Sequence, residues 1–163
     1  MNHTKGFTLI EIMVVIAIIG ILASIVLAAV SSARKQGKDG SAMQSITSIR
    51  SQAELCYNGG ATCGSATYGT AGAGNVTGGT PSGLSGACND TQVVNLLIAA
   101  SAQLPNTTAV NCNVGLSGKT YIVWTTLNTQ TAPANFCIDS TGFAGNLAIA
   151  PAATAITGDV KCR

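Results

Sequence analysis

The chain has 163 residues, of which 9% are charged and 4% are aromatic, and its formal net charge at pH 7 is +2. This length is enough for one small folded domain beside an apolar segment. From residue 57 onward three basic and three acidic residues balance each other, so this part lacks the basic surface that nucleic-acid binding requires. The composition therefore gives no direct signal for a nucleic-acid partner.

Residues 6–30, GFTLIEIMVVIAIIGILASIVLAAV, form an apolar stretch in which Glu11 is the only ionisable side chain. Fifteen of these residues are Leu, Ile, Val or Phe. Together they favour membrane insertion by roughly 7 kcal/mol, against about 3 kcal/mol for one acidic residue. A helix over residues 7–30 spans about 36 Å at a rise of ~1.5 Å per residue, enough to cross a bilayer. We therefore predict a transmembrane helix here.

The start of this stretch differs from an ordinary secretory signal, because its small residue, Gly6, precedes the apolar core instead of following it. The motif Lys5-Gly6-Phe7-Thr8-Leu9-Ile10-Glu11 closely resembles the class III signal of type IV prepilins and pseudopilins. The resemblance covers about the first thirty residues. It implies that a membrane peptidase cuts between Gly6 and Phe7, and that the new amino terminus of Phe7 is methylated.

Glu11 has two possible roles. The resemblance implies that its carboxylate pairs with the terminal amine of a neighbouring subunit during assembly. Such pairing offsets the several kcal/mol that an unpaired charge costs among apolar helices. The alternative is that Glu11 lies near the membrane interface and extends its carboxylate toward water.

The chain then divides into a leader (1–6), a long helix (7–57) whose first part (7–30) is the membrane segment or filament core, and a head (58–163). An apolar stripe at helical spacing marks the second, amphipathic half of the helix. Gly59 and Gly60 are expected to end it. The stripe consists of Ala42, Ile46, Ile49, Ala53 and Cys56.

Residues 58–89 are rich in Gly, Thr, Ser and Ala, and we predict a long connection between helix and sheet. Gly72-Ala73-Gly74 is interpreted as a flexible loop, since the lysine of a phosphate-binding loop does not follow it. Asp90 is expected to cap a short helix over residues 91–104 that Pro105 ends, buried against the sheet.

The clearest strand is predicted over residues 119–127, where Tyr121, Val123, Thr125 and Leu127 share one face. A second strand is predicted at 135–139, followed by a Ser140-Thr141-Gly142 turn. Residues 147–150 and 155–161 are expected to add edge strands. The predicted fold class is α+β: a long N-terminal helix, apolar then amphipathic, packed on a small antiparallel sheet with disulfides.

All six cysteines follow the apolar segment, and an even number in a small exported domain indicates a disulfide framework. Six cysteines allow 15 pairings, among which the sequence does not choose. We predict pairing in sequence order, and the last pair would resemble the C-terminal disulfide loop of pilins. Free thiols are the alternative. The predicted pairs are Cys56 with Cys63, Cys88 with Cys112, and Cys137 with Cys162.

Neither a catalytic nor a metal site is predicted. The only histidine, His3, lies in the leader, and the sequence has no C-x-x-C motif. Without histidine the head lacks the usual base for Ser or Cys nucleophiles. Its carboxylates, Asp90, Asp139 and Asp159, are far apart, and Asp139 is interpreted as a turn former. We predict a non-enzymatic protein with no cofactor.

The resemblance implies a structural subunit of a type IV pilus or related filament. Its precursor would lie in the bacterial inner membrane, surrounded by lipid, with the head extracytoplasmic; after assembly it would form a cell-surface pilus. Its partners would be further copies of itself in a helical homopolymer, the prepilin peptidase and methyltransferase, and the assembly machinery of the inner membrane. The alternatives are a pseudopilin of a type II secretion or competence system, or a membrane-anchored binding module. The sequence does not choose among adhesion, motility, DNA uptake and secretion.

Overall fold

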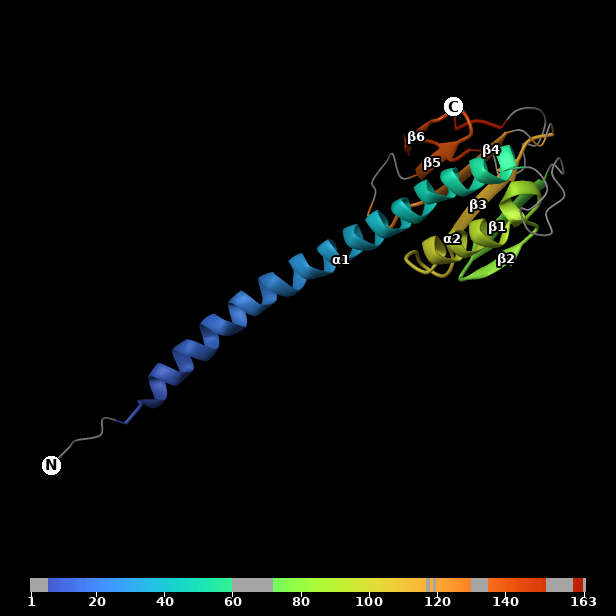
Figure 1. Cartoon of the computed structure of the whole chain (residues 1–163). Helices are drawn as coiled ribbons and strands as arrows, with labels where there is room; N and C mark the ends of the chain where they lie inside the picture. The colour runs from blue at the N-terminus through green and yellow to red at the C-terminus, as the bar shows by residue number, and fades with distance from the viewer. Residues whose placement is uncertain are drawn as a thin grey trace. The chain divides into compact units, whose positions relative to one another are not determined.

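The computed structural model describes residues 6–59, 72–116, 118, 120–129, 135–151 and 160–162, with the side chains of 57–59 left out. The chain divides into two compact units, Met1–Lys35 and Gln36–Arg163, and the first helix contributes to both. The elements in chain order, labelled in Figure 1, are α1 (Leu9–Gly59), β1 (Gly72–Thr77), β2 (Thr80–Ser82), η1 (Gly86–Asn89), α2 (Thr91–Ser101), β3 (Ala109–Val114), β4 (Tyr121–Thr126), β5 (Asn135–Asp139) and β6 (Ala144–Leu147).

The first unit is an apolar helix with nothing described packed on it. Its large apolar side chains are between 40% exposed, at Val30, and 81% exposed, at Phe7. A helix that is apolar on all sides is typical of a membrane span or a buried core. By length and composition α1 is able to cross a membrane, as the sequence predicts.

The second unit contains a six-stranded sheet in the order β2-β1-β3-β4-β5-β6, with every neighbouring pair antiparallel. The strands from β3 to β6 follow one another in both sequence and space. The β1–β2 hairpin is attached at the β3 side of the sheet. The predicted α+β class is confirmed.

The main core lies between one face of this sheet and the two helices. The predicted stripe of α1 is buried throughout, from Ala42 to Cys56. Its members from Ala42 to Ala53 pack in one cluster with Leu97 of α2 and with sheet residues such as Val110 and Val123. Figure 1 shows the second half of α1 and α2 lying along the sheet. The helical periodicity of the sequence thus identified the buried face correctly.

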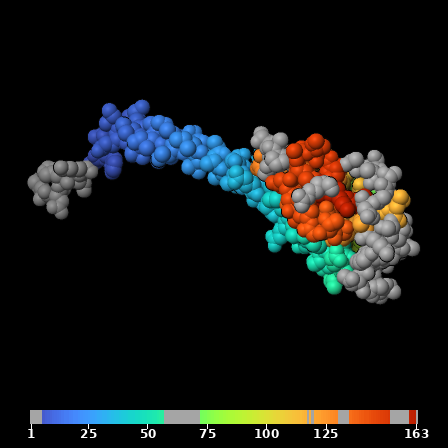
Figure 2. All heavy atoms as spheres, turned by 90° about the horizontal axis from the view of Figure 1, so that it is seen from above, coloured from blue at the N-terminus to red at the C-terminus, as the bar shows by residue number. Residues whose placement is uncertain are grey.

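A smaller apolar cluster covers the opposite face of the sheet at its β5 end. It joins Ile122 and Cys137 to Val160 and Cys162 of the C-terminal segment, with Trp124 half-buried beside them. Figure 2 shows β5, β6 and the described C-terminal residues, orange to red, gathered on one side of this unit. The sheet is therefore covered on both faces in this region.

The predicted connection over residues 58–89 was wrong in part, because it contains β1, β2 and η1. Gly72-Ala73-Gly74, interpreted as a flexible loop, lies in β1, which is an inner strand. A Cβ atom on Gly74 would lie 2.6 Å from the backbone of Gly83 and Leu84. Glycine is required at position 74 because the chain leaving β2 crosses directly over β1. Glycines are depleted in strands, so the sequence of β1 did not indicate a strand.

The β3 strand was not predicted, although Val110, Cys112 and Val114 alternate with two asparagines. Asparagine is depleted in strands, so the alternation resembles a polar loop. In the structure both faces of β3 are covered, and Asn111 and Asn113 are 8% and 2% exposed.

The predicted edge strands were displaced. The last strand is β6, Ala144–Leu147, instead of residues 147–150. It pairs as soon as the turn after β5 reverses the chain, and it ends where Leu147 lies opposite Asn135, the first residue of β5. Of the predicted strand at 155–161, residues 155–159 lie outside the described residues, and Val160 and Lys161 are not in a strand.

Replacing Gly74 with alanine tests the close approach between β1 and the chain after β2. The new Cβ would force the backbone of Gly83 and Leu84 away, so we expect the free energy of unfolding to fall by about 1–3 kcal/mol. The measurement is denaturant unfolding of the full chain in mild detergent, followed by the fluorescence of its single tryptophan.

The control is Gly40→Ala, because Gly40 is helical, exposed and has no atom within 4 Å of an added Cβ. That substitution should leave stability unchanged or raise it by up to about 1 kcal/mol. Equal effects of the two substitutions would contradict the proposed crossing.

Candidate functional site at the N-terminus

The residues just before α1 present an exposed, non-helical backbone. Gly6 and Phe7 precede the helix, which begins at Leu9. No other part of the structure lies within 4 Å of a Cβ built on Gly6, and Phe7 is 81% exposed. The peptide bond between these two residues therefore lies in accessible backbone.

Thr8 and Glu11 cap the start of α1 reciprocally. The Glu11 Oε2 atom accepts hydrogen bonds from the Thr8 backbone N–H at 2.8 Å and from the Thr8 hydroxyl at 2.7 Å. The Glu11 N–H donates to Thr8 Oγ1 at 3.4 Å. This is a capping box, in which two helix-start donors that lack a partner within the helix are both satisfied. The Thr-x-x-Glu spacing carries this signal in the sequence, and our sequence analysis missed it.

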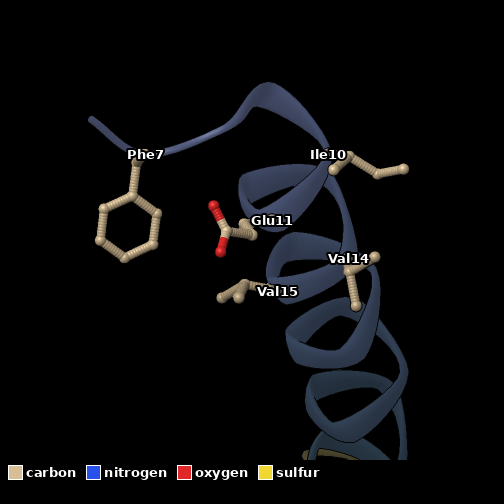
Figure 3. A pocket seen from close by; sticks show the side chains of 5 residues that line it. All are labelled: Phe7, Ile10, Glu11, Val14 and Val15. Atoms are coloured by element: carbon tan, nitrogen blue, oxygen red, sulfur yellow. The ribbon is translucent and has the colours of Figure 1, made fainter. Parts of the chain in front are cut away.

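Glu11 is the single charged group in an apolar hollow of about 400 Å³. The other lining residues are Phe7, Ile10, Val14 and Val15. Figure 3 shows the carboxylate and Val15 on the side of the helix toward the Phe7 ring, with Ile10 and Val14 pointing to the other side. Both bonds to the Thr8 donors use Oε2, and within the described residues Oε1 accepts no hydrogen bond.

In the second unit, Asp39 of α1 is a buried carboxylate that the sequence analysis did not single out. It is 2% exposed and binds the segment after β4. Oδ1 accepts from the backbone N–H and side-chain amide of Asn128, at 2.8 and 2.7 Å. Oδ2 accepts from the backbone N–H and hydroxyl of Thr129, at 2.9 and 2.5 Å. Burial alone would raise the pKa of Asp39, but these four hydrogen bonds outweigh it and lower the pKa. Nothing local in the sequence reveals a partner about ninety residues away.

Asp139 organises the turn after β5, in agreement with its interpretation as a turn former. Its Oδ1 accepts from Thr141, through N–H and hydroxyl, and from the Phe143 N–H. Its Oδ2 accepts from the Cys162 N–H at 3.0 Å. Burial would raise the pKa of Asp139, but the bonds from Thr141, Cys162 and Phe143 lower it. Both oxygens are thus engaged in holding the turn and the C-terminal segment.

Two disulfides agree with pairing in sequence order: Cys88–Cys112 and Cys137–Cys162. The first joins η1 to β3, and the second joins β5 to the C-terminal segment. Cys56 is also disulfide-bonded, while its predicted partner Cys63 lies outside the described residues.

Asp90 caps α2 as predicted, by accepting from the N–H groups of Gln92 and Val93. Asp159 lies outside the described residues.

The N-terminal geometry and one comparison define the class of the first unit. The Gly6-Phe7 bond, Glu11 and the apolar helix that follows fit the class III signal of type IV prepilins. Residues 1–27 match the family model described as the prokaryotic N-terminal methylation motif. The match supports a type IV pilin-like or pseudopilin protein, a structural class, and fits a membrane-anchored precursor. The motif implies processing by prepilin peptidase and assembly into type IV filaments. No solved structure matched the chain.

Replacing Asp39 with asparagine tests the buried carboxylate. An amide cannot accept four hydrogen bonds, so at pH 7 we expect the free energy of unfolding to fall by about 2–4 kcal/mol. The pKa of Asp39 is lowered in the fold from 3.8, so its stabilisation is present above that value. It is lost as the pH falls through the folded pKa. The difference in free energy of unfolding between the wild type and Asp39→Asn should therefore become smaller as the pH falls below about 4. The measurement is denaturant unfolding of both proteins at several pH values.

The control is Asp90→Asn, because asparagine caps a helix about as well as aspartate. We expect this variant to unfold close to the wild type at pH 7. A gap for Asp39→Asn that stays constant down to pH 2 would contradict the role of its charge.

Proposed function

We propose that the chain is a structural subunit of a type IV pilus or a closely related type IV filament. The observation that carries the proposal is the apolar part of the first helix, residues 9–30, which is exposed on all sides and has the capped Glu11 as its only charge. Such a surface needs lipid around it before assembly and other helices around it afterwards. The precursor has residues 1–6 in the cytoplasm, residues 7–30 in the inner membrane and the head (58–163) outside.

Processing begins at the bond between Gly6 and Phe7. Gly6 has no side chain to obstruct a membrane peptidase, and the bond precedes the helix, so it is not protected by helical hydrogen bonding. Cleavage creates a positively charged amine on Phe7, and methylation preserves its charge. The capping box survives the cut, because the Thr8 N–H that Glu11 binds belongs to the Phe7–Thr8 peptide bond.

Glu11 then serves two functions with its two oxygens. Oε2 remains bound to Thr8 within each subunit. Oε1 accepts from the Phe7 amine of a neighbouring subunit as the two apolar helices meet. An unpaired amine or carboxylate among apolar helices costs several kcal/mol, so pairing favours correct axial alignment of the subunits.

The assembled product is a helical homopolymer with the apolar helices inside and the heads outside, built by assembly machinery in the inner membrane. The disulfides of the second unit fit a head in an oxidising space outside the cytoplasm, because disulfides persist at the cell surface and in the periplasm. They are compatible with a surface pilus and with a secretion pseudopilus. Purified filaments should contain this chain, identified by mass, and its abundance in them would distinguish a major from a minor subunit.

Gly6→Val tests processing. A branched side chain next to the scissile bond should block the peptidase, so we expect full-length precursor in the membrane and no filaments. The measurement is the N-terminal residue of the membrane-bound protein by mass spectrometry. Gly20→Ala is the control, since it changes a glycine within the helix and should leave cleavage intact. Mature protein beginning with Phe7 in the Gly6→Val strain would refute the cleavage site.

Substitutions at Glu11 and Thr8 distinguish the contribution of the helix cap to filament assembly from that of the Glu11 charge. Glutamine keeps the capping box but has no charge, whereas leucine removes both. If charge pairing drives assembly, all variants are cleaved and filament yield falls in the order wild type, Glu11→Gln, Glu11→Leu. Loss of the charged pair corresponds to about 3–5 kcal/mol.

Thr8→Ala keeps the charge and weakens only the cap, by about 0.5–2 kcal/mol, so it should still assemble. Filament yield is measured by shearing and quantitative electron microscopy. Wild-type yield for Glu11→Gln, together with failure of Thr8→Ala, would assign Glu11 to capping alone.

A further inference from the structure

Basic residues follow the apolar stretch of α1 directly. Arg34 and Lys35 lie in the first unit, four and five residues after Val30, and Lys38 lies in the second unit, which begins at Gln36. All three side chains are exposed. Within the described part of the chain, none of them has a hydrogen bond or an ion pair. At ~1.5 Å per residue, Arg34 and Lys35 are roughly 6–8 Å beyond the end of the apolar stretch along the helix.

The only acidic residue between Glu11 and Glu54 is Asp39, and within the described residues it forms no ion pair with these basic side chains. Its two oxygens are buried and accept four hydrogen bonds from Asn128 and Thr129. The exposed charge after the apolar stretch is therefore positive only.

A second copy of the chain is a poor partner for this charge. Among the described acidic residues, Asp39, Asp90 and Asp139 are buried and Glu54 is half-buried. Glu11 is exposed, but it precedes Arg34 by 23 residues, roughly 35 Å along a helix, which corresponds to the opposite side of a membrane. The described surface of a neighbour thus offers no acidic group at the right level.

A lipid bilayer does offer negatively charged groups at this level. Headgroup phosphates lie just outside the hydrocarbon core, which is the level that residues immediately after a membrane-spanning stretch occupy. Basic side chains next to a membrane helix attract anionic lipids. Arginine binds phosphate through two hydrogen bonds and lysine through its point charge.

We propose that Arg34 and Lys35 bind anionic phospholipid headgroups of the extracytoplasmic leaflet. This contact sets the depth of the precursor in the membrane until it is extracted. The inference rests on the proposed insertion of residues 7–30 and is independent of filament assembly.

The test uses the full-length precursor in phosphatidylcholine vesicles with trace spin-labelled phosphatidylglycerol or phosphatidylcholine. The measured quantity is the relative association constant of the two labelled lipids with the protein. We expect the wild type to prefer phosphatidylglycerol about five-fold or more, roughly the contribution of one basic residue at an anionic surface. In the variant Arg34→Gln/Lys35→Gln the ratio should fall to about one. High salt should also lower it, because about 1 M salt shortens the screening length to ~3 Å.

The matched control pair is Lys35→Gln and Lys161→Gln, which remove the same charge from two exposed lysines. Only Lys35→Gln should lower the ratio. Resistance to alkaline extraction reports insertion separately. An inserted wild type without a preference, or equal effects of the two lysine variants, would overturn this inference and leave the proposed function standing. A precursor that fails to insert would overturn both.

Discussion

The dominant constraint on this chain is the apolar surface of residues 7–30, which no described part of the protein covers. Water is an unfavourable environment for fifteen Leu, Ile, Val and Phe side chains, so the segment needs lipid or other helices around it. The second unit must therefore fold without help from this surface. It does so by placing its own amphipathic half of α1 and α2 on one face of a sheet.

The second unit has few aromatic residues to bury. Buried carboxylates add to its stability by holding separate chain segments together through hydrogen bonds. Asp39 joins α1 to the segment after β4, Asp90 starts α2, and Asp139 holds both the last turn and Cys162. Each carboxylate bonds at least two donors, which is what makes its burial tolerable. Two disulfides add links between η1 and β3 and between β5 and the C-terminal segment. Small domains with limited cores commonly depend on such links.

The sequence predicted the parts of the fold that periodicity and local chemistry specify: the buried stripe of α1, the capped α2, and the central strands β4 and β5. It failed where the decisive contact is distant. Gly72 and Gly74 occupy β1 because another chain segment passes over them, and Asn111 and Asn113 are buried in β3, which lies between β1 and β4 in the sheet. The N-terminal motif is recognisable from the sequence as a whole, and the capping box inside it follows from the Thr-x-x-Glu spacing of Thr8 and Glu11.

The capping box narrows the choice of residue at position 11. A cap alone accepts glutamate or glutamine, since either side chain reaches back to the Thr8 N–H. The proposed pairing with the Phe7 amine requires a negative charge, which glutamine lacks. Aspartate has the charge, but its side chain is one methylene shorter than those used in a capping box. Glutamate is the residue that satisfies both conditions, with Oε2 bound inside the subunit and Oε1 left for a neighbour. A charge that is already fixed by its own helix also loses little side-chain entropy when a second partner binds it, so assembly is favoured more than it would be with a flexible carboxylate.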